Sequence, residues 1–183
     1  MAVRKFLAKI VATLLVKYFE REEFFSYNNI SLKVSKGVFK PRYTFSSLLL
    51  LKTLEKFSPK TPFLDIGCGS GILGIFYSSI SKSYGVLSDI DWNACKNSKE
   101  NAIKNNVIVD VVQADVATAF RENVFRLVIA NPPYLPLKRR EKMLNIAAGE
   151  ELEILEKFVK TSATCLKRSE VLLITTSTLT PLK

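Results

Sequence analysis

Residues 62–80, PFLDIGCGSGILGIFYSSI, decide the fold class of this chain. The stretch opens with the short apolar run PFLDIG, which is typical of a buried β-strand. Glycines at alternate positions then form a loop, and the apolar residues that follow take the spacing of a helix. A strand that runs through a glycine-rich turn into a helix predicts the first unit of a parallel α/β sheet.

The same alternation continues toward the C-terminus. Apolar runs predict strands within residues 84–90, 107–115, 126–130 and 170–176. Helices are predicted over 92–106 and 150–166, with a shorter one over 116–120. Strands that alternate with helices of this length favour an α/β fold with a doubly wound, mostly parallel, Rossmann-like sheet.

The N-terminal part of the chain has a different character. The pattern predicts a basic helix over 3–23, a hairpin within 29–41 that turns at Ser35–Gly37, and a helix over 44–57 capped by Thr44 or Ser46. We therefore expect two regions: residues 1–43 as a helix and hairpin extension, and residues 44–183 as the main domain. The uncharged run Ile10–Val16 is too short to cross a bilayer, so no membrane partner is expected.

The composition excludes several classes of site. The chain has 183 residues and no histidine, and its three cysteines, Cys68, Cys95 and Cys165, form no C-x-x-C pair. A zinc site, a disulfide framework and a Ser-His or Cys-His hydrolase are therefore not expected. We expect no metal site and a reducing, cytoplasmic location.

Positive charge is concentrated in the first third of the sequence. Residues 1–60 hold 12 Lys and Arg against 4 Asp and Glu, whereas residues 61–183 hold 15 against 13. A second basic cluster, KRREK, occupies residues 138–142. Such clusters are usually solvated surface, but they also bind polyanions, so a nucleic-acid partner stays open.

The loop DIGCGSG, residues 65–71, has the glycine spacing of a ligand-binding turn. Gly67, Gly69 and Gly71 allow the backbone to turn tightly and to approach a ligand beside the free amides of a helix N-terminus. The pattern is G-x-G-x-G and not the nicotinamide fingerprint G-x-G-x-x-G. Asp65 at the start of the loop disfavours a pyrophosphate and favours a ligand that carries a positive charge.

Two further acids are predicted at the same edge of the sheet. Asp89 ends the second predicted strand and can accept hydrogen bonds from both hydroxyls of a ribose. Asp115 ends the third and can accept from the exocyclic amine of an adenine. Each acid alone could simply cap a helix. Together with Asp65 and the glycine loop, they favour an adenosine-type ligand.

These residues resemble a known family. The motifs DIGCGSG, SDI with Asp89, QAD with Asp115 and NPPY at 131–134 are similar to those of the class I S-adenosylmethionine-dependent methyltransferases that modify planar nitrogens. The segment VFKPRYTFSSLL, residues 38–49, resembles the one before the cofactor loop in the HemK-related branch, the release-factor glutamine methyltransferases in their short archaeal and eukaryotic form. The resemblance covers about residues 30–176.

The resemblance implies S-adenosyl-L-methionine as the cofactor. The cofactor-binding residues that it implies are Thr44, Asp65, Gly67, Gly69, Gly71, Asp89, Asp115, Val116 and Asn131. It also implies a translation release factor as the substrate and a small zinc-binding activator subunit as a partner. Two features depart from the family: Tyr43 stands where an acid usually precedes Thr44, and no final strand pair is predicted before Lys183.

The motif Asn131-Pro132-Pro133-Tyr134 follows a predicted strand and has a stiff backbone. An amide or aromatic amine is a poor nucleophile because its lone pair is delocalised. The Asn131 side-chain oxygen and the Pro132 carbonyl oxygen would accept its two hydrogens and hold the nitrogen toward the methyl group. Asn131, Pro132 and Tyr134 are the predicted catalytic residues, and Pro133 and Tyr134 are predicted to bind the flat face of the substrate.

Three functions fit these motifs. The first is methylation of the glutamine in the G-G-Q motif of a translation release factor. The second is methylation of an exocyclic amine of adenine or guanine in RNA or DNA, which the basic first third and residues 138–142 favour. The third is a cofactor-binding subunit without activity, which the departures from the family pattern favour.

Overall fold

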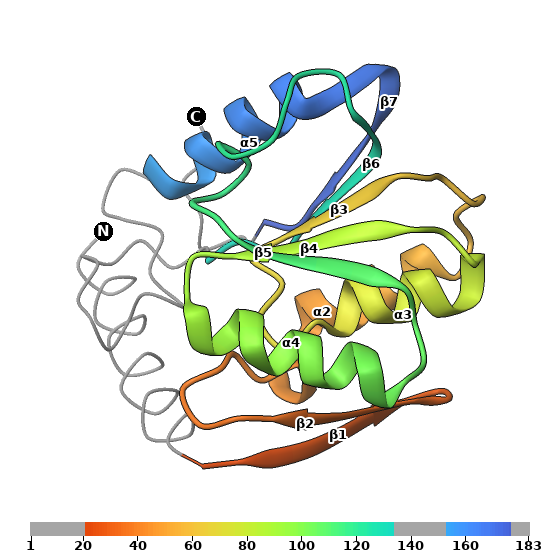
Figure 1. Cartoon of the computed structure of the whole chain (residues 1–183), viewed down its shortest axis with the longest axis vertical. Helices are drawn as coiled ribbons and strands as arrows, with labels where there is room; N and C mark the ends of the chain where they lie inside the picture. The colour runs from red at the N-terminus through yellow and green to blue at the C-terminus, as the bar shows by residue number, and fades with distance from the viewer. Residues whose placement is uncertain (1–20, 134–152, 177–183) are drawn as a thin grey trace.

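A five-stranded parallel sheet forms the centre of the fold in the computed structural model, which describes residues 21–133 and 153–176 (Figure 1). Its strand order is β5-β4-β3-β6-β7. In chain order the strands are β3 Phe63–Ile66, β4 Gly85–Asp89, β5 Val109–Gln113, β6 Phe125–Ala130 and β7 Leu166–Ile174. All four residues of β3 are buried, as the continuous apolar run of the central parallel strand predicts.

Helices cover both faces of this sheet. They are α2 Phe45–Leu54, α3 Ile72–Ser81, α4 Trp92–Lys104 and α5 Glu153–Cys165. The first three lie on one face and α5 lies on the other (Figure 1). Successive residues of a strand point to opposite faces, so Phe63 belongs to the core beneath α2, α3 and α4, and Leu64 belongs to the core beneath α5. The predicted doubly wound α/β fold is confirmed.

A two-stranded antiparallel hairpin packs below the helical layer (Figure 1). Its strands are β1 Glu23–Tyr27 and β2 Ile30–Val34. The turn falls at Asn28, whose φ of 49° is left-handed, and not at Ser35–Gly37. The prediction of a hairpin is right in kind but wrong in place. Its predicted first arm, before Ser35, forms the second strand β2, and the first strand β1 comes from residues that carried no strand prediction. A turn does form after β2, where Val38 N–H donates to Ser35 O at 3.1 Å.

The helix predicted over 3–23 falls mostly outside the described residues. Its last residue, Glu23, begins β1, so the predicted helix extends too far. Phe25, Leu32 and Val34 of the hairpin belong to the same buried core as residues of α2, α3 and the sheet. The hairpin is therefore fixed to the main domain by apolar packing.

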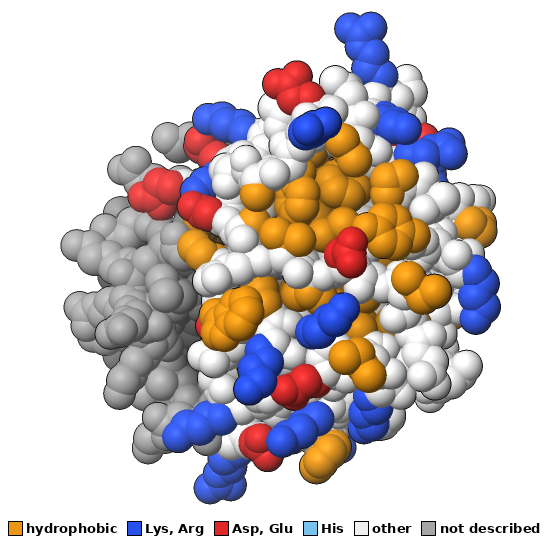
Figure 2. Space-filling view, viewed as in Figure 1, with side chains coloured by type: hydrophobic (Ala, Val, Ile, Leu, Met, Phe, Trp, Pro, Cys, Tyr) orange, Lys and Arg blue, Asp and Glu red, His pale blue; other side chains and the backbone are white. Residues whose placement is uncertain are grey.

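On the face drawn in Figure 2, hydrophobic and charged side chains of the described residues occupy different regions of the surface. Hydrophobic side chains gather over the sheet between α5 and β5, whereas Lys, Arg, Asp and Glu alternate over α4 and the hairpin below. One such pair is Lys33 Nζ with Glu22 Oε1 at 2.9 Å. In the described part of the chain, no helix has the length and apolar character that a membrane crossing needs.

Candidate active site

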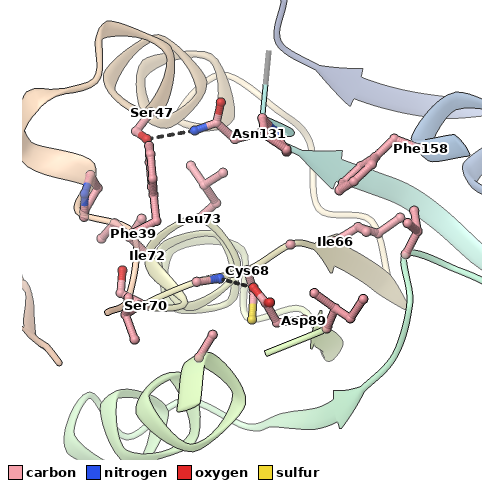
Figure 3. Close-up of a pocket in the computed structure, with 18 of the residues that line it drawn as sticks. Phe39, Ser47, Ile66, Cys68, Ser70, Ile72, Leu73, Asp89, Asn131 and Phe158 are labelled. Atoms are coloured by element: carbon pink, nitrogen blue, oxygen red, sulfur yellow. Dashed lines mark hydrogen bonds between the residues drawn. The ribbon is translucent and has the colours of Figure 1, made fainter. Parts of the chain in front are cut away.

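A pocket opens where the carboxyl ends of β3, β4 and β6 meet, and it encloses about 930 Å³ of empty space including its mouth (Figure 3). The glycine loop, the ends of β4 and β6, the segment 38–41 and α5 all contribute to its wall. This position follows from topology, because the strand order changes direction beside β3 and leaves a crevice at the carboxyl edge.

The glycine loop forms the floor of the pocket through a backbone that side chains would strain. Gly67, Gly69 and Gly71 have φ values of 68°, 54° and 85°. Gly67 and Cys68 donate their N–H groups to Ser88 O at 2.8 and 3.0 Å, which fixes the loop to β4. Gly67 and Gly69 line the pocket, whereas Gly71 lies behind it as the N-cap of α3.

Asp89 stands beside this loop at the end of β4 and lines the pocket. Its Oδ2 accepts from Gly69 N–H at 2.9 Å, and its Oδ1 accepts from Asp91 N–H at 3.0 Å (Figure 3). Burial raises the pKa of the carboxyl, although these backbone donors oppose the rise. The predicted acid of the second strand is thus held rigidly at the pocket wall, with lone pairs left for a ligand.

Asp115 also lines the pocket, together with Val116. It lies two residues after the end of β5, and its carboxylate pairs with the Lys157 ammonium of α5. The short helix predicted over 116–120 is wrong, because this segment forms only turns. Val116 has a left-handed φ of 60°, which stops a helix at its first residue.

Asp65 lies where the sequence did not predict it. Its side chain is fully buried under α3, and its Oδ2 accepts from Gly74 N–H at 2.8 Å. Within the described ranges its Oδ1 has no hydrogen-bond partner, and burial raises the pKa of the carboxyl to about 7. Asp65 is not among the residues that line the pocket, and its predicted contact with a ligand stays a prediction. As a mid-strand residue it points to the face that α3 covers.

Thr44 is placed differently from its predicted role as well. It is the N-cap residue of α2, but its side chain makes no capping hydrogen bond. Its buried hydroxyl lies 3.1 Å from Pro41 O and 2.7 Å from Ser47 Oγ. Ser47 and Pro41 line the pocket and Thr44 does not, so it stands one layer behind the wall.

Asn131 follows β6 and lines the pocket opposite α2 (Figure 3). Its Nδ2 donates to Ser47 Oγ at 3.0 Å, and its Oδ1 accepts from Thr175 Oγ1 at 2.6 Å. Pro133 lines the pocket next to it, while Pro132 is buried outside the lining. Tyr134 and the basic cluster at 138–142 lie outside the described residues.

Sequence reasoning missed two groups of residues that shape the site. Phe158 of α5 lines the pocket and packs on the loop, where a Cβ added at Gly67 would stand 3.3 Å from its ring. The second group consists of asparagines spaced four residues apart on α4, namely Asn97, Asn101 and Asn105. Their spacing places them on one face of a helix, which is a signal that could have found them.

The asparagines of α4 bind the free edge of β2. Asn101 accepts from Lys33 N–H and donates to Lys33 O, both at 2.9 Å, and it also donates to Ser70 O of the glycine loop at 2.9 Å. Asn105 accepts from Ser31 N–H and donates to Ser31 O, both at 3.0 Å. These side-chain amides act as a neighbouring strand would, and Asn101 joins the hairpin to the loop.

The described residues hold no group of three or more His, Cys, Asp or Glu that could bind a metal ion. The arrangement instead offers a glycine-lined floor, two carboxylates and an amide around one pocket. This pocket can bind a nucleoside-containing ligand and place an amide beside it. Such a pocket is typical of an α/β enzyme domain that uses an adenosine cofactor.

Comparison with known proteins gives the family. The model of the family described as methyltransferase small domain matches residues 29–182. The chain belongs to this family and is an S-adenosylmethionine-dependent methyltransferase of class I.

Relatives and solved structures agree with this assignment. A putative protein N5-glutamine methyltransferase of Methanocaldococcus jannaschii is 36% identical over 160 residues, 82% of this chain and 78% of that protein. The ribosomal RNA small subunit methyltransferase C of Serratia proteamaculans is 34% identical over 118 residues, 61% of this chain and 32% of that protein. The chain spans 25% of another relative, from Mycoplasma genitalium, so several relatives are much longer.

The fold recurs in the 16S rRNA N2 G1207 methyltransferase of T. thermophilus, solved in complex with AdoMet and guanosine. The TM-score is 0.69 at 20% identity, over 88% of this chain and 43% of that chain. At this identity, the likeness supports the fold alone.

Proposed function

We propose that this methyltransferase transfers the methyl group of S-adenosyl-L-methionine to the side-chain nitrogen of a protein glutamine, with the G-G-Q glutamine of a translation release factor as the substrate. The observation that carries the proposal is the position of Asn131, whose amide lines the same pocket as the glycine loop and Asp89. The glutamine methyltransferase name of the M. jannaschii relative, which aligns over most of both chains, adds support.

The residues of the pocket fit the proposed cofactor. Gly69 N–H holds the Asp89 carboxylate in place, and the carboxylate oxygens keep further lone pairs free. An acceptor for ribose hydroxyls needs such free lone pairs. Apolar side chains of Ile90 and Phe158 belong to the wall and offer flat contact to an adenine. Asp115 can accept from the adenine amine through the oxygen that does not pair with Lys157.

Asn131 and Pro132 would orient the target nitrogen. The cofactor supplies a methyl group already activated by a positively charged sulfur, so the protein has to align the nucleophile rather than generate it. An amide oxygen has two lone pairs, and the Asn131 Oδ1 uses one of them for Thr175. The second can accept one hydrogen of the target amide, and the Pro132 carbonyl oxygen can accept the other. This chemistry needs no histidine, and the chain has none.

A second candidate substrate is an exocyclic base amine in RNA. The ribosomal RNA methyltransferase C relatives favour it, and so does the excess of Lys and Arg in residues 1–60. We prefer the protein substrate because the M. jannaschii relative aligns over 82% of this chain and 78% of its own length, whereas the Serratia relative aligns over 61% and 32%. The roles of Tyr134 and of residues 138–142 remain part of the proposal.

The small zinc-binding activator also remains part of the proposal. β7 is an edge strand of the described sheet, where such a subunit could reach the backbone. Both the activator and the release factor are therefore tested together with the activity.

The test uses labelled S-adenosyl-L-methionine with a release factor or total RNA, with and without an activator subunit. We expect label in the release factor, lost when its G-G-Q glutamine is replaced. Asn131→Ala should reduce turnover by at least about 100-fold, whereas the exposed Asn93→Ala serves as a matched control and should leave it unchanged. Label in RNA alone would move the assignment to the second candidate. Cofactor binding without transfer to either would favour a subunit without activity.

A further inference from the structure

A chain of hydroxyl groups runs behind the pocket wall and ends on Asn131. It begins at Pro41 O and passes through the Thr44 hydroxyl to the Ser47 hydroxyl. From Ser47 it reaches the Asn131 Nδ2 at 3.0 Å, the step drawn in Figure 3. Thr44 and Ser47 are buried, with 8% and 2% of their surfaces exposed. Water therefore has little access to compete for these hydrogen bonds.

The Thr44 hydroxyl faces two acceptors, Pro41 O and Ser47 Oγ, and donation to Pro41 O is the arrangement that leaves the Ser47 hydrogen an acceptor within the chain. Each hydroxyl has one hydrogen to donate, and Pro41 O can only accept. If the Thr44 hydroxyl donates to Pro41 O, its oxygen is left to accept the hydrogen of Ser47 across 2.7 Å. Ser47 Oγ then has no hydrogen to offer Asn131 and can only accept. The amide must turn its NH₂ group toward Ser47, because its oxygen there would face another acceptor.

The hydrogen bond at the Asn131 oxygen is consistent with this orientation of the amide. Thr175 Oγ1 lies 2.6 Å from Asn131 Oδ1 and donates to it. Thr175 is 7% exposed, and its N–H donates to Ala130 O at 3.2 Å, which extends the contact between β6 and β7. A threonine hydroxyl can also accept, so Thr175 stabilises the orientation but does not dictate it. The orientation of the Asn131 amide is set by the hydrogen bonds of Thr44 and Ser47.

We propose that Thr44, Ser47 and Thr175 are positioning residues that fix which end of the Asn131 amide is the acceptor. This inference rests on the proposed function of Asn131 as an acceptor for the target nitrogen. It replaces the expected role of Thr44 as a cofactor contact, since Thr44 stands behind the wall. An amide held in this orientation selects targets that present N–H donors and disfavours targets that present a carbonyl oxygen.

Thr44→Val is the decisive variant. Valine matches the shape of threonine and suits its extended backbone, with φ of −114° and ψ of 113°, and no capping bond is lost. The change frees the Ser47 hydrogen to donate toward Asn131, so the amide can adopt both orientations. We expect kcat to fall at least tenfold, cofactor Kd to stay within about twofold, and Thr44→Ser to restore kcat.

A readout without substrate separates this proposal from the proposed function. In ¹⁵N-labelled protein, the Asn131 side-chain NH₂ pair, assigned by its absence in Asn131→Ala, should appear as one slowly exchanging pair. Thr44→Val should shift or broaden it, and Thr44→Ser should not. If no substrate is methylated, the proposed function fails. The spectrum still tests whether Thr44 and Ser47 fix the orientation of the Asn131 amide. An unchanged NH₂ pair in Thr44→Val, or a loss of cofactor affinity with normal kcat, would overturn the inference.

Discussion

Replacing Asn101 by alanine should weaken both the fold and cofactor binding, because this one side chain joins the hairpin to the glycine loop. Asn101 is 1% exposed and makes three hydrogen bonds of 2.9 Å, two to Lys33 of β2 and one to Ser70 of the loop. Lys33 O keeps a second donor, the Asn97 Nδ2 at 2.8 Å. Lys33 N–H and Ser70 O lose the contact with Asn101.

The magnitude follows from these contacts. A hydrogen bond contributes about 1 kcal/mol net, and a buried polar group left without a partner costs about 1–3 kcal/mol. Ser70 O is such a buried group, and the Lys33 N–H is half-buried, so we expect Asn101→Ala to lower the free energy of unfolding by about 2–3 kcal/mol. Release of the Ser70 carbonyl loosens the loop that must order around a ligand, so cofactor Kd should rise about tenfold, or ~1.4 kcal/mol.

The matched control is Asn105→Ala on the same face of α4. Asn105 binds Ser31 N–H and Ser31 O in the same manner, but it is half-buried and does not contact the glycine loop. This variant should lower stability by about 1–2 kcal/mol and leave cofactor Kd unchanged.

Both quantities can be measured on the protein as it stands. The single tryptophan, Trp92, is 63% exposed at the start of α4 and reports urea unfolding by fluorescence. Titration calorimetry with S-adenosyl-L-methionine gives Kd. If Asn101→Ala and Asn105→Ala alter Kd equally, or neither does, the coupling of the hairpin to the loop is refuted.

Three further outcomes test the site. Asp89→Ala should weaken cofactor binding by about 1–3 kcal/mol in calorimetry, and unchanged binding would mean that the ligand lies elsewhere. Asp65 holds a proton up to pH about 7 in the fold but only to about 3.8 when unfolded, so stability should fall by up to ~1.4 kcal/mol per pH unit between those values. Asp65→Asn should flatten this slope in urea titrations across that range, and an unaltered slope would contradict the assignment. Gly71→Ala should lower Tm more than Gly69→Ala. An added Cβ would stand 2.9 Å from Ile75 Cδ1 at Gly71 but 3.7 Å from its nearest neighbour at Gly69. Equal losses of Tm would show that only the backbone strain common to both sites matters.

The central sheet could be predicted because its strands are short buried runs with a glycine loop after the first. Burial on both faces favours runs that are almost wholly apolar, and the sequence has two of them, FLDI and FRLVIA, each with a single charged residue. The pocket acids Asp89 and Asp115 follow from strand ends in the same way. The burial of Asp65 did not follow, because Asp65 lies one residue before the end of β3, and its side chain points into the core beneath α3.

The hairpin was misplaced for a different reason. Asn28 and Asn29 are a turn signal, but Glu22 and Glu23 fall in the helix predicted over 3–23, and no strand was predicted between that helix and the turn. The turn at Ser35–Gly37 was real, yet it leads to the pocket-lining segment 38–41 and not to a strand. A local turn pattern specifies a change of direction, whereas tertiary packing decides which segments pair.

The contacts around Asn131 and along α4 lay beyond local patterns, since Ser47 and Asn131 are 84 positions apart in the sequence. Both nevertheless use the same property of asparagine. A side-chain amide offers a donor and an acceptor together, so Asn101 can satisfy the N–H and the C=O of one β2 residue, as a strand would. Asn131 likewise donates to Ser47 and accepts from Thr175. An aspartate could only accept at either position, which would leave a buried carbonyl or hydroxyl oxygen facing a carboxylate. The hairpin therefore needs an amide at Asn101 for its attachment, and the proposed function needs one at Asn131 to keep an acceptor in a fixed orientation.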